Sequence, residues 1–378
     1  MDLSNINRPF RLKLTEHLLK QFSGNLLYKV IKYNVLSLKT LGLHITTACN
    51  YNCIYCYAER YKDNKLSLEK LLSLINEAKA LGAESVNILG GEPLLNKDLE
   101  KIIYHINNKR MRVMLFTNGS LITDSWIKFF KKINKIILII KYDCEQAVYS
   151  KHTRSDYPVT HIEDNIIKLM ENKIPVITFT VVTKHNLNFI NNILSRSVTL
   201  GAYPKLHPYI PELTKSPQLN EELEITSSEW SSVLKRISYV YSPLEELIYA
   251  LGAFKLGICS CFAHNIYVTA DGYCLPCPES PLELNLGNVL ETPLKEIWLR
   301  FKEKRIDWLK LPTECNGCNN KNACMGGCKV YTYLRFKNFN RKDPLCRDEI
   351  PTTYSHCVYA LSRILPNEPS YKFLKIIK

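Results

Sequence analysis

Apolar positions change repeatedly between two spacings from residue 41 to residue 209. Short runs rich in Val, Ile and Leu, typical of buried strands, alternate with stretches in which apolar residues recur every three or four positions, as in helices. Alternation in this order indicates βα units around a parallel sheet. The predicted strands are 41–46, 85–89, 112–117, 135–142, 175–182 and 203–209. The predicted helices are 67–81, 97–107, 123–132, 162–172 and 187–200, with Ser67 and Thr123 as N-caps.

The chain on either side of this repeat is organised differently. Residues 1–40 hold a predicted helix at 14–22 and a strand-like run at 27–35, which we expect to cap the sheet. The remaining predicted elements are a proline-broken loop at 211–220, a polar helix start at 226–229, helices at 232–240 and 244–256, and a hairpin at 266–273 with an Asp-Gly turn.

Composition and charge add two restrictions. Fifty basic against thirty-six acidic residues give a formal charge of +14, but the basic residues are dispersed, and we expect no nucleic-acid partner. The N-terminus lacks a secretory signal, and the longest apolar run, 136–140, is far too short to span a membrane. We therefore expect a cytoplasmic protein without a membrane partner, in which fourteen cysteines favour metal ligation over disulfides.

Three of these cysteines stand together directly after the first predicted strand. Cys49, Cys53 and Cys56 have the spacing C-x3-C-x2-C. A four-iron cluster normally takes four cysteine thiolates, so a triplet leaves one iron free to chelate a small molecule. A zinc site or three buried thiols would also explain these residues, but a closed structural zinc site takes four ligands. The triplet therefore predicts an iron-sulfur cluster with one open iron.

The triplet resembles that of the radical S-adenosylmethionine (SAM) superfamily. Tyr55 stands where that family has an aromatic beside the adenine, and Gly90-Gly91-Glu92-Pro93 resembles its motif for the SAM ammonium group. The resemblance implies an α/β fold, a partial (β/α)6 TIM-type barrel, and cleavage of SAM to a 5′-deoxyadenosyl radical. It also implies that the SAM contacts lie at the C-terminal strand ends. These residues are Tyr55, Gly90, Gly91, Glu92, Asn118, Asp143 and Arg154, of which Arg154 would pair with the SAM carboxylate.

A second group of cysteines, within 259–346, resembles the SPASM extension of radical SAM enzymes in order and spacing. That resemblance implies two auxiliary four-iron clusters. Cys315, Cys318, Cys324 and Cys346 would hold one of them. Cys261, Cys277 and Cys328 would hold the other, with Cys259, Cys274 or an open iron in the fourth position. Two zinc ribbons are the alternative.

Two positions depart from the pattern of sulfatase-maturing relatives. Lys141 precedes Tyr142 and Asp143 in the fourth strand, where those relatives have serine. Pro278 follows Cys277 where they have an aspartate base, so Glu279 would serve as the base, or the reaction differs. The departures favour a reaction other than sulfatase maturation. Asp143 itself would touch the ribose, orient its neighbours, or act only as a strand-end cap.

The predicted domains follow from these boundaries. They are an N-terminal cap (1–40), a radical SAM partial barrel (41–240), a small cysteine-rich α+β SPASM domain (241–358) and a C-terminal tail (359–378).

Three functions are compatible with this organisation. The favoured one is a radical SAM iron-sulfur oxidoreductase that introduces a crosslink, a thioether or an oxidation into a ribosomally made peptide, with electrons from a flavodoxin or ferredoxin. Residues 1–40 are short for a leader-peptide module, which favours instead a dehydrogenase or epimerase of a small molecule such as an aminocyclitol or sugar. The third is a non-catalytic zinc-binding protein.

Overall fold

The computed structural model describes residues 38–60, 64–211, 217–237, 262, 264–318 and 326–346. Several predictions lie outside these residues. They are the helix at 14–22, the strand at 27–35, the helix at 244–256, the tail at 359–378, and the cysteines Cys259, Cys261 and Cys324.

The described chain is organised around one open eight-stranded sheet with the order β6-β5-β4-β3-β2-β1-β7-β8. All six strands predicted in the βα repeat are present, in parallel and in sequence order. Their bounds are β1 Thr40–His44, β2 Ser85–Leu89, β3 Arg112–Thr117, β4 Ile136–Lys141, β5 Val176–Val182 and β6 Tyr203–Pro208. The two edge strands, β6 and β8, do not pair with each other, so the expectation of a partial rather than a closed barrel is confirmed.

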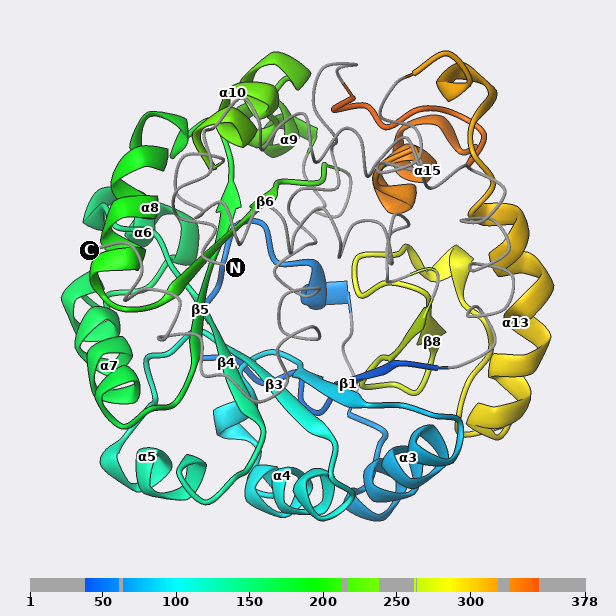
Figure 1. Cartoon of the computed structure of the whole chain (residues 1–378), viewed down its shortest axis with the longest axis horizontal. Coiled ribbons are helices and arrows are strands. Elements are labelled where there is room, and N and C mark those ends of the chain that lie inside the picture. Colours follow the sequence, from blue (N-terminus) through cyan, green and yellow to red (C-terminus); the bar gives the residue numbers. More distant parts are fainter. Residues whose placement is uncertain are drawn as a thin grey trace, which may run out of the picture.

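Helices cover the outer face of this curved sheet (Figure 1). Ser67 and Thr123 are N-caps as predicted, since their side chains accept hydrogen bonds from the backbone N–H groups of Lys70 and Trp126. The five predicted helices of the repeat are α3 Leu68–Ala80, α4 Leu99–Asn108, α5 Asp124–Phe130, α7 Val159–Glu171 and α8 Ile190–Thr199.

Alternation of side chains along the strands separates two faces. Val113 and Leu115 of β3 are fully buried in the core cluster beneath the helices. Met114, between them, belongs to a separate cluster with Ile139 and Ile177 on the inner face. The inner face is therefore apolar as well, although no helix of the repeat covers it.

A hairpin from the C-terminal part extends the sheet beyond β1. The hairpin predicted at 266–273 is present as β7 Asn265–Val268 and β8 Cys274–Leu275, which pair antiparallel. β7 also runs parallel to β1, a pairing that the sequence did not predict. α13 Leu294–Trp308 continues the outer helix layer beside α3 (Figure 1), and the Leu294 N–H donates to the Glu77 carboxylate at 2.9 Å. The two parts of the chain thus share one sheet and one helix layer.

Two elements differ from the prediction, and a third confirms a predicted helix start. α6 Gln146–Thr153 follows β4 and was not predicted. α9 Pro217–Leu223 occupies part of the predicted loop 211–220, because proline at a first helical position sacrifices no helix hydrogen bond. α10 Ser227–Ile237 begins at the predicted polar helix start 226–229 and includes part of the helix predicted at 232–240: the Thr226 hydroxyl accepts from the Glu229 N–H while the Glu229 carboxylate accepts from the Thr226 N–H, a capping box.

The remaining described elements are short. They are α15 Lys329–Phe336 and the 3-10 turns η2 Tyr57–Arg60, η3 Pro93–Leu95, η4 Leu187–Phe189, η5 Leu282–Leu284 and η6 Thr313–Cys315. Within the part of the chain that the structure describes, no helix has the length and apolar character needed to cross a membrane.

Candidate active site

The loop that carries the cysteine triplet begins where β1 ends, and its backbone is fixed at both ends. Near its start, the carbonyls of Thr46 and Ala48 accept from the N–H groups of Gly91 and Glu92, each at 2.8 Å. Further along, the N–H of Ile54 donates to the carbonyl of His152 at 2.9 Å. The end of β2 and the end of α6 therefore hold the loop between them.

The paired glycines after β2 allow this close approach. A Cβ atom on Gly90 would lie 2.5 Å from the carbonyl oxygen of Thr46, and one on Gly91 would lie 2.2 Å from that of Ala48. Gly90 also has a φ of +151°, which side-chain-bearing residues rarely adopt. The close backbone contact with the cysteine loop thus explains why both positions hold glycine. Their part in binding SAM stays a prediction.

Glu92 joins the ends of β2 and β3. Its buried carboxylate accepts hydrogen bonds from the Thr117 hydroxyl at 2.7 Å, from the Asn118 N–H at 2.7 Å and from the Leu94 N–H at 3.0 Å. Burial raises the pKa of Glu92, and the three donors oppose that rise. The carboxylate therefore has a positioning role within the protein, whether or not it also meets the SAM ammonium group as predicted.

Asn118 links β3 to the cysteine loop. Its side-chain amide donates to Asn50 at 2.8 Å, its oxygen accepts from Ser120, and the Asn50 amide donates to the Ser120 hydroxyl at 2.9 Å. Asn50 directly follows Cys49, so this closed network holds the first cysteine of the triplet. No sequence motif pointed to Asn50 or Ser120.

The three thiols of the loop differ in their exposure to solvent. Cys49 is exposed, while Cys53 and Cys56 are half-buried. Burial and then repulsion from Glu92 and Cys56 raise the pKa of Cys49, against an opposing backbone hydrogen bond. Burial raises the pKa of Cys53 to about 12; the charge of Lys141 opposes this, and repulsion from Cys56 and Cys49 adds to it. Because metal coordination deprotonates a thiol outright, these raised pKa values are compatible with the iron-sulfur cluster that the sequence predicts.

Asp143 lies beneath this loop rather than in open space. It is buried, and its carboxylate accepts from Lys141 Nζ at 2.5 Å, from His152 Nδ1 at 3.0 Å and from the Asn186 amide at 2.8 Å. Burial opposes ionisation, but Lys141 and His152 together lower the pKa of Asp143 to about 2. Asp143 is thus an ionised anchor with three protein partners, and its predicted contact with the ribose remains untested.

Tyr55 and Arg154 occupy different surroundings. The Tyr55 ring lies edge-on to His152 with 5.2 Å between ring centroids, and its hydroxyl is buried without a hydrogen-bond partner among the described residues. Arg154 is the exposed C-cap of α6 with a φ of +49°. The cysteine loop thus lies close to the Arg154 backbone, because the carbonyl of the preceding Thr153 accepts from the Asn52 N–H at 3.1 Å.

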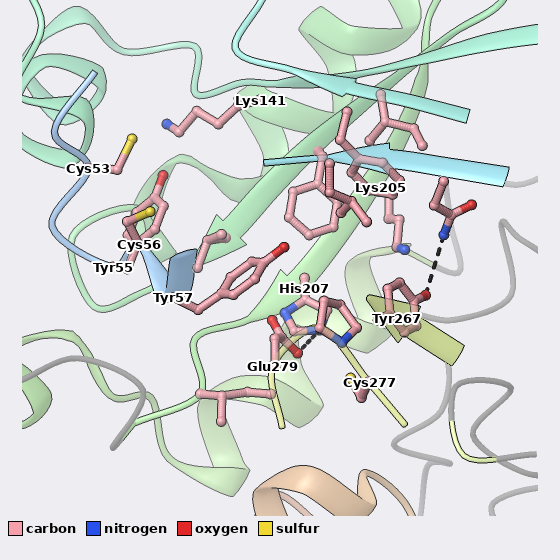
Figure 2. Close-up of a pocket in the computed structure, with 18 of the residues that line it drawn as sticks. Cys53, Tyr55, Cys56, Tyr57, Lys141, Lys205, His207, Tyr267, Cys277 and Glu279 are labelled. Atoms are coloured by element: carbon pink, nitrogen blue, oxygen red, sulfur yellow. Dashed lines mark hydrogen bonds and ion pairs between the residues drawn. The ribbon is translucent and has the colours of Figure 1, made fainter. Parts of the chain in front are cut away.

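A cavity of about 270 Å³ lies between the cysteine loop, the inner face of the sheet and the hairpin β7–β8 (Figure 2). Most of its wall is apolar and comes from alternate positions of β2 to β6. The cysteine loop contributes Cys53, Tyr55, Cys56 and Tyr57, and the hairpin and the turn after it contribute Asn265, Tyr267, Cys277, Pro278 and Glu279. The charged lining residues are Lys141, Lys205 and Glu279.

Glu279, the predicted base, faces this cavity beside His207 of β6. The His207 Nε2 and the Glu279 carboxylate are 3.5 Å apart. Burial and then the charge of Lys205 lower the pKa of His207 to about 3, so the imidazole is neutral near pH 7. The structure places Glu279 where a substrate would lie, and its role as a base is still a prediction. Sequence reasoning missed His207 and Lys205, because no motif marks cavity-facing positions of β6.

Two neighbouring cysteines, one in the hairpin and one just after it, differ in their access to the cavity. Both belong to the same core cluster, but Cys277 also lines the cavity, whereas Cys274 is fully buried. Burial strongly raises the pKa of Cys274. Of the two candidates for the fourth ligand of the first auxiliary cluster, Cys274 is absent from the cavity wall and Cys259 lies outside the described residues, and the choice between them stays a prediction.

The later SPASM cysteines are organised around Asp343. Its carboxylate accepts from the Cys328 N–H at 2.6 Å, and its carbonyl accepts from the Cys346 N–H at 2.8 Å. Cys315 and Cys318 close a tight turn, with the Cys318 N–H donating to the Cys315 carbonyl at 3.1 Å. Asp343 thus connects segments assigned to the two predicted auxiliary clusters. It carried no motif signal.

No group of three or more His, Cys, Asp or Glu side chains within the described ranges is arranged to hold a single metal ion. The assignment of iron-sulfur clusters therefore rests on the cysteine pattern and on comparison with known families.

Comparison with known families identifies two domains in the chain. Residues 43–194 match the model of the radical SAM superfamily, and residues 259–319 match that of the SPASM iron-sulfur cluster-binding domain. The chain therefore carries a radical SAM domain followed by a SPASM domain, and these two domains imply SAM and iron-sulfur clusters as cofactors.

Solved structures of two proteins, SuiB and anSMEcpe, share the fold. Streptococcus suis SuiB bound to precursor peptide SuiA is 17% identical, with 84% of this chain and 78% of that chain covered and a TM-score of 0.67. A histidine-tagged form of anSMEcpe with bound AdoMet is 18% identical, with 89% and 98% covered and a TM-score of 0.66. Native anSMEcpe with bound AdoMet and Kp18Cys peptide is 18% identical, with 87% of this chain and 99% of that chain covered and a TM-score of 0.66. The arrangement of barrel and SPASM domain is therefore a known one.

Proposed function

We propose that this enzyme modifies a peptide by abstracting a hydrogen atom from an apolar side chain. One observation carries the proposal: segments from both predicted cluster regions, at Cys53 and Cys56 and at Cys277, line the same cavity. A substrate in that cavity would contact the radical-generating loop on one side and the SPASM hairpin on the other.

The lining of the cavity supports a peptide over a sugar or aminocyclitol. The inner face of the sheet presents Met114, Phe116, Ile139, Ile177 and Phe179. A sugar would need many hydrogen-bonding partners, since buried polar groups left unpaired are costly, whereas an aliphatic or aromatic side chain needs apolar surface. Lys205, His207 and Glu279 also line the cavity, and peptide backbone or charged groups would bind to them.

The residues of the site have distinct parts in the proposed reaction. Cys49, Cys53 and Cys56 would hold the first cluster, and the backbone at Gly90 and Gly91, with Glu92, would meet the SAM ammonium group. Bound SAM and its cluster supply a 5′-deoxyadenosyl radical when reduced. The apolar wall would exclude water and orient the side chain, and Glu279 would receive a proton.

Electron supply and removal complete the proposal. A flavodoxin or ferredoxin would deliver the electron. Two auxiliary clusters, one on Cys315, Cys318, Cys324 and Cys346 and one on Cys261, Cys277, Cys328 and Cys259, would accept an electron after abstraction. The SPASM match supports auxiliary clusters in this part of the chain.

The test uses protein loaded with iron and sulfide under anaerobic conditions. Reduction with dithionite in the presence of SAM should release 5′-deoxyadenosine, and Cys56→Ala should release none. A precursor peptide encoded beside the gene should then lose hydrogen or gain a crosslink by mass spectrometry, while an aminocyclitol should remain unchanged. Conversion of the aminocyclitol instead of the peptide would replace this proposal with the small-molecule alternative.

A further inference from the structure

Lys141 brings a positive charge to the cysteine loop from the C-terminal end of β4. Its side chain lines the cavity and is only 13% exposed. The ammonium lies 4.8 Å from the ring centroid of Tyr149 and 5.7 Å from that of Tyr55, distances at which a cation is attracted to an aromatic face. Figure 2 shows the ammonium directed toward Cys53.

Asp143 fixes this charge in place. Its carboxylate pairs with Lys141 Nζ at 2.5 Å and is itself held by His152 and Asn186. Asp143 is 1% exposed and is absent from the cavity wall, whereas Lys141 belongs to that wall together with Cys53. The ion pair is therefore oriented, with its cation on the side of the cysteine loop and its anion on the side of His152.

We propose that Lys141 is a positioning residue that raises the reduction potential of the cluster held by Cys49, Cys53 and Cys56, with Asp143 setting the size of that effect. The inference deepens the proposed function and rests on its assignment of the first cluster. Reduction adds negative charge to a cluster, so a nearby buried cation stabilises the reduced form. Net charge and burial are among the properties that set such potentials, and a low local dielectric strengthens the interaction.

Lys141 and Asp143 must change the reduction potential of the cluster in opposite directions. Removing the cation by Lys141→Met should lower the potential. Removing the anion by Asp143→Asn leaves the cation less neutralised and should raise it. A purely structural role would not predict opposite signs, because either substitution would disturb the same local packing. Lys141→Arg keeps the charge and should remain near the wild-type value.

The experiment is a redox titration of the reconstituted full-length enzyme, followed by electron paramagnetic resonance. Titrations are done without SAM, and the first cluster is identified separately as the component whose spectrum changes when SAM is added. We expect about a tenfold change in the ratio of reduced to oxidised cluster at a fixed potential, equivalent to about 59 mV for a one-electron couple, downward for Lys141→Met and upward for Asp143→Asn.

Lys205→Met is the matched control. It removes the same charge from the same cavity, but Figure 2 places Lys205 away from Cys53, so its shift should be much smaller. Shifts of the same sign in Lys141→Met and Asp143→Asn, or no shift in either, overturn the inference. If the Lys141→Met variant fails to load the cluster, the Asp143→Asn variant alone decides. A reduction potential that falls or stays unchanged in Asp143→Asn then overturns the inference. A wild-type enzyme without any SAM-responsive cluster would refute the proposed function instead.

Discussion

The ring of Tyr267 fills the space that a side chain on Gly42 would occupy. A Cβ atom on Gly42 would lie 2.0 Å from Cδ1 of Tyr267, and the two residues are register partners in β1 and β7. The Tyr267 hydroxyl reaches over β1 and accepts from the Asn87 amide of β2 at 3.3 Å. One glycine therefore lets an aromatic of the SPASM hairpin form part of the cavity wall.

Gly42→Ala should displace Tyr267 and destabilise the protein. Overpacking a well-filled site typically costs about 1–3 kcal/mol, which chemical denaturation of the metal-free protein would detect. The double variant Gly42→Ala/Tyr267→Ala should recover part of that loss, because the clash is gone. If the effects of the two single substitutions on the free energy of unfolding simply add in the double variant, the two residues are not coupled as described.

Glu92→Ala should destabilise the junction of β2 and β3. The substitution leaves the Thr117 hydroxyl and the N–H groups of Asn118 and Leu94 without their acceptor. Buried donors left unpaired cost about 1–3 kcal/mol each, so a loss of about 2–4 kcal/mol is expected after partial relaxation. Equilibrium urea unfolding measures it, and Glu100→Ala on the exposed face of α4 serves as the control. A loss no larger than that of the control would contradict the assignment.

Asp143 should make stability depend on pH between about 4 and 2. Its pKa in the folded protein is lowered to about 2 from an ordinary value of 3.8, so its ionised form stabilises the fold above pH 4 and loses that contribution as the pH falls toward 2. The shift corresponds to about 2 kcal/mol. The difference in unfolding free energy between wild type and Asp143→Asn, measured on metal-free protein, should therefore shrink across this range. A difference independent of pH would mean that Asp143 is not ionised in the fold.

Cys277 and Cys274 should differ in their effect on iron content. Three four-iron clusters would give about 12 irons per chain, and Cys277→Ser should remove up to about four of them. Cys274→Ser should keep the iron but destabilise the core, because a hydroxyl without a partner is costly among apolar side chains. Iron and sulfide assays, together with denaturation curves of the same samples, distinguish the two variants. Equal iron loss in both variants would make Cys274 a ligand.

The strands were predictable because each is a compact aliphatic run with its own boundaries. β2 and β3 match the predicted bounds residue for residue. The missed helix α6 has the sequence QAVYSKHT, in which no apolar stripe recurs at helical spacing and no side chain caps the N-terminus. Its position is decided instead by contacts such as the one between Ile54 and His152, which no local pattern reveals.

The candidate site was predictable only where short motifs mark it. The cysteine triplet and Gly90-Gly91-Glu92 are local in sequence, and the structure brings them together as expected. The partners of Asp143 come from Lys141, His152 and Asn186, and Tyr267 meets Asn87 from far along the chain. Such contacts depend on the order of strands in the sheet, in particular on the pairing of β7 with β1.

The pairing of β7 with β1 also affects how the enzyme is made. β1 begins at Thr40, but its neighbour β7 begins at Asn265. At a synthesis rate of about 5–20 residues per second, roughly 10–45 seconds pass between the two. An uncovered strand edge is a template for unwanted pairing. Nascent chains halted before Asn265 should therefore associate more readily than chains halted beyond Leu275. The hairpin that completes the cavity thus also covers the edge of β1 against pairing with other nascent chains.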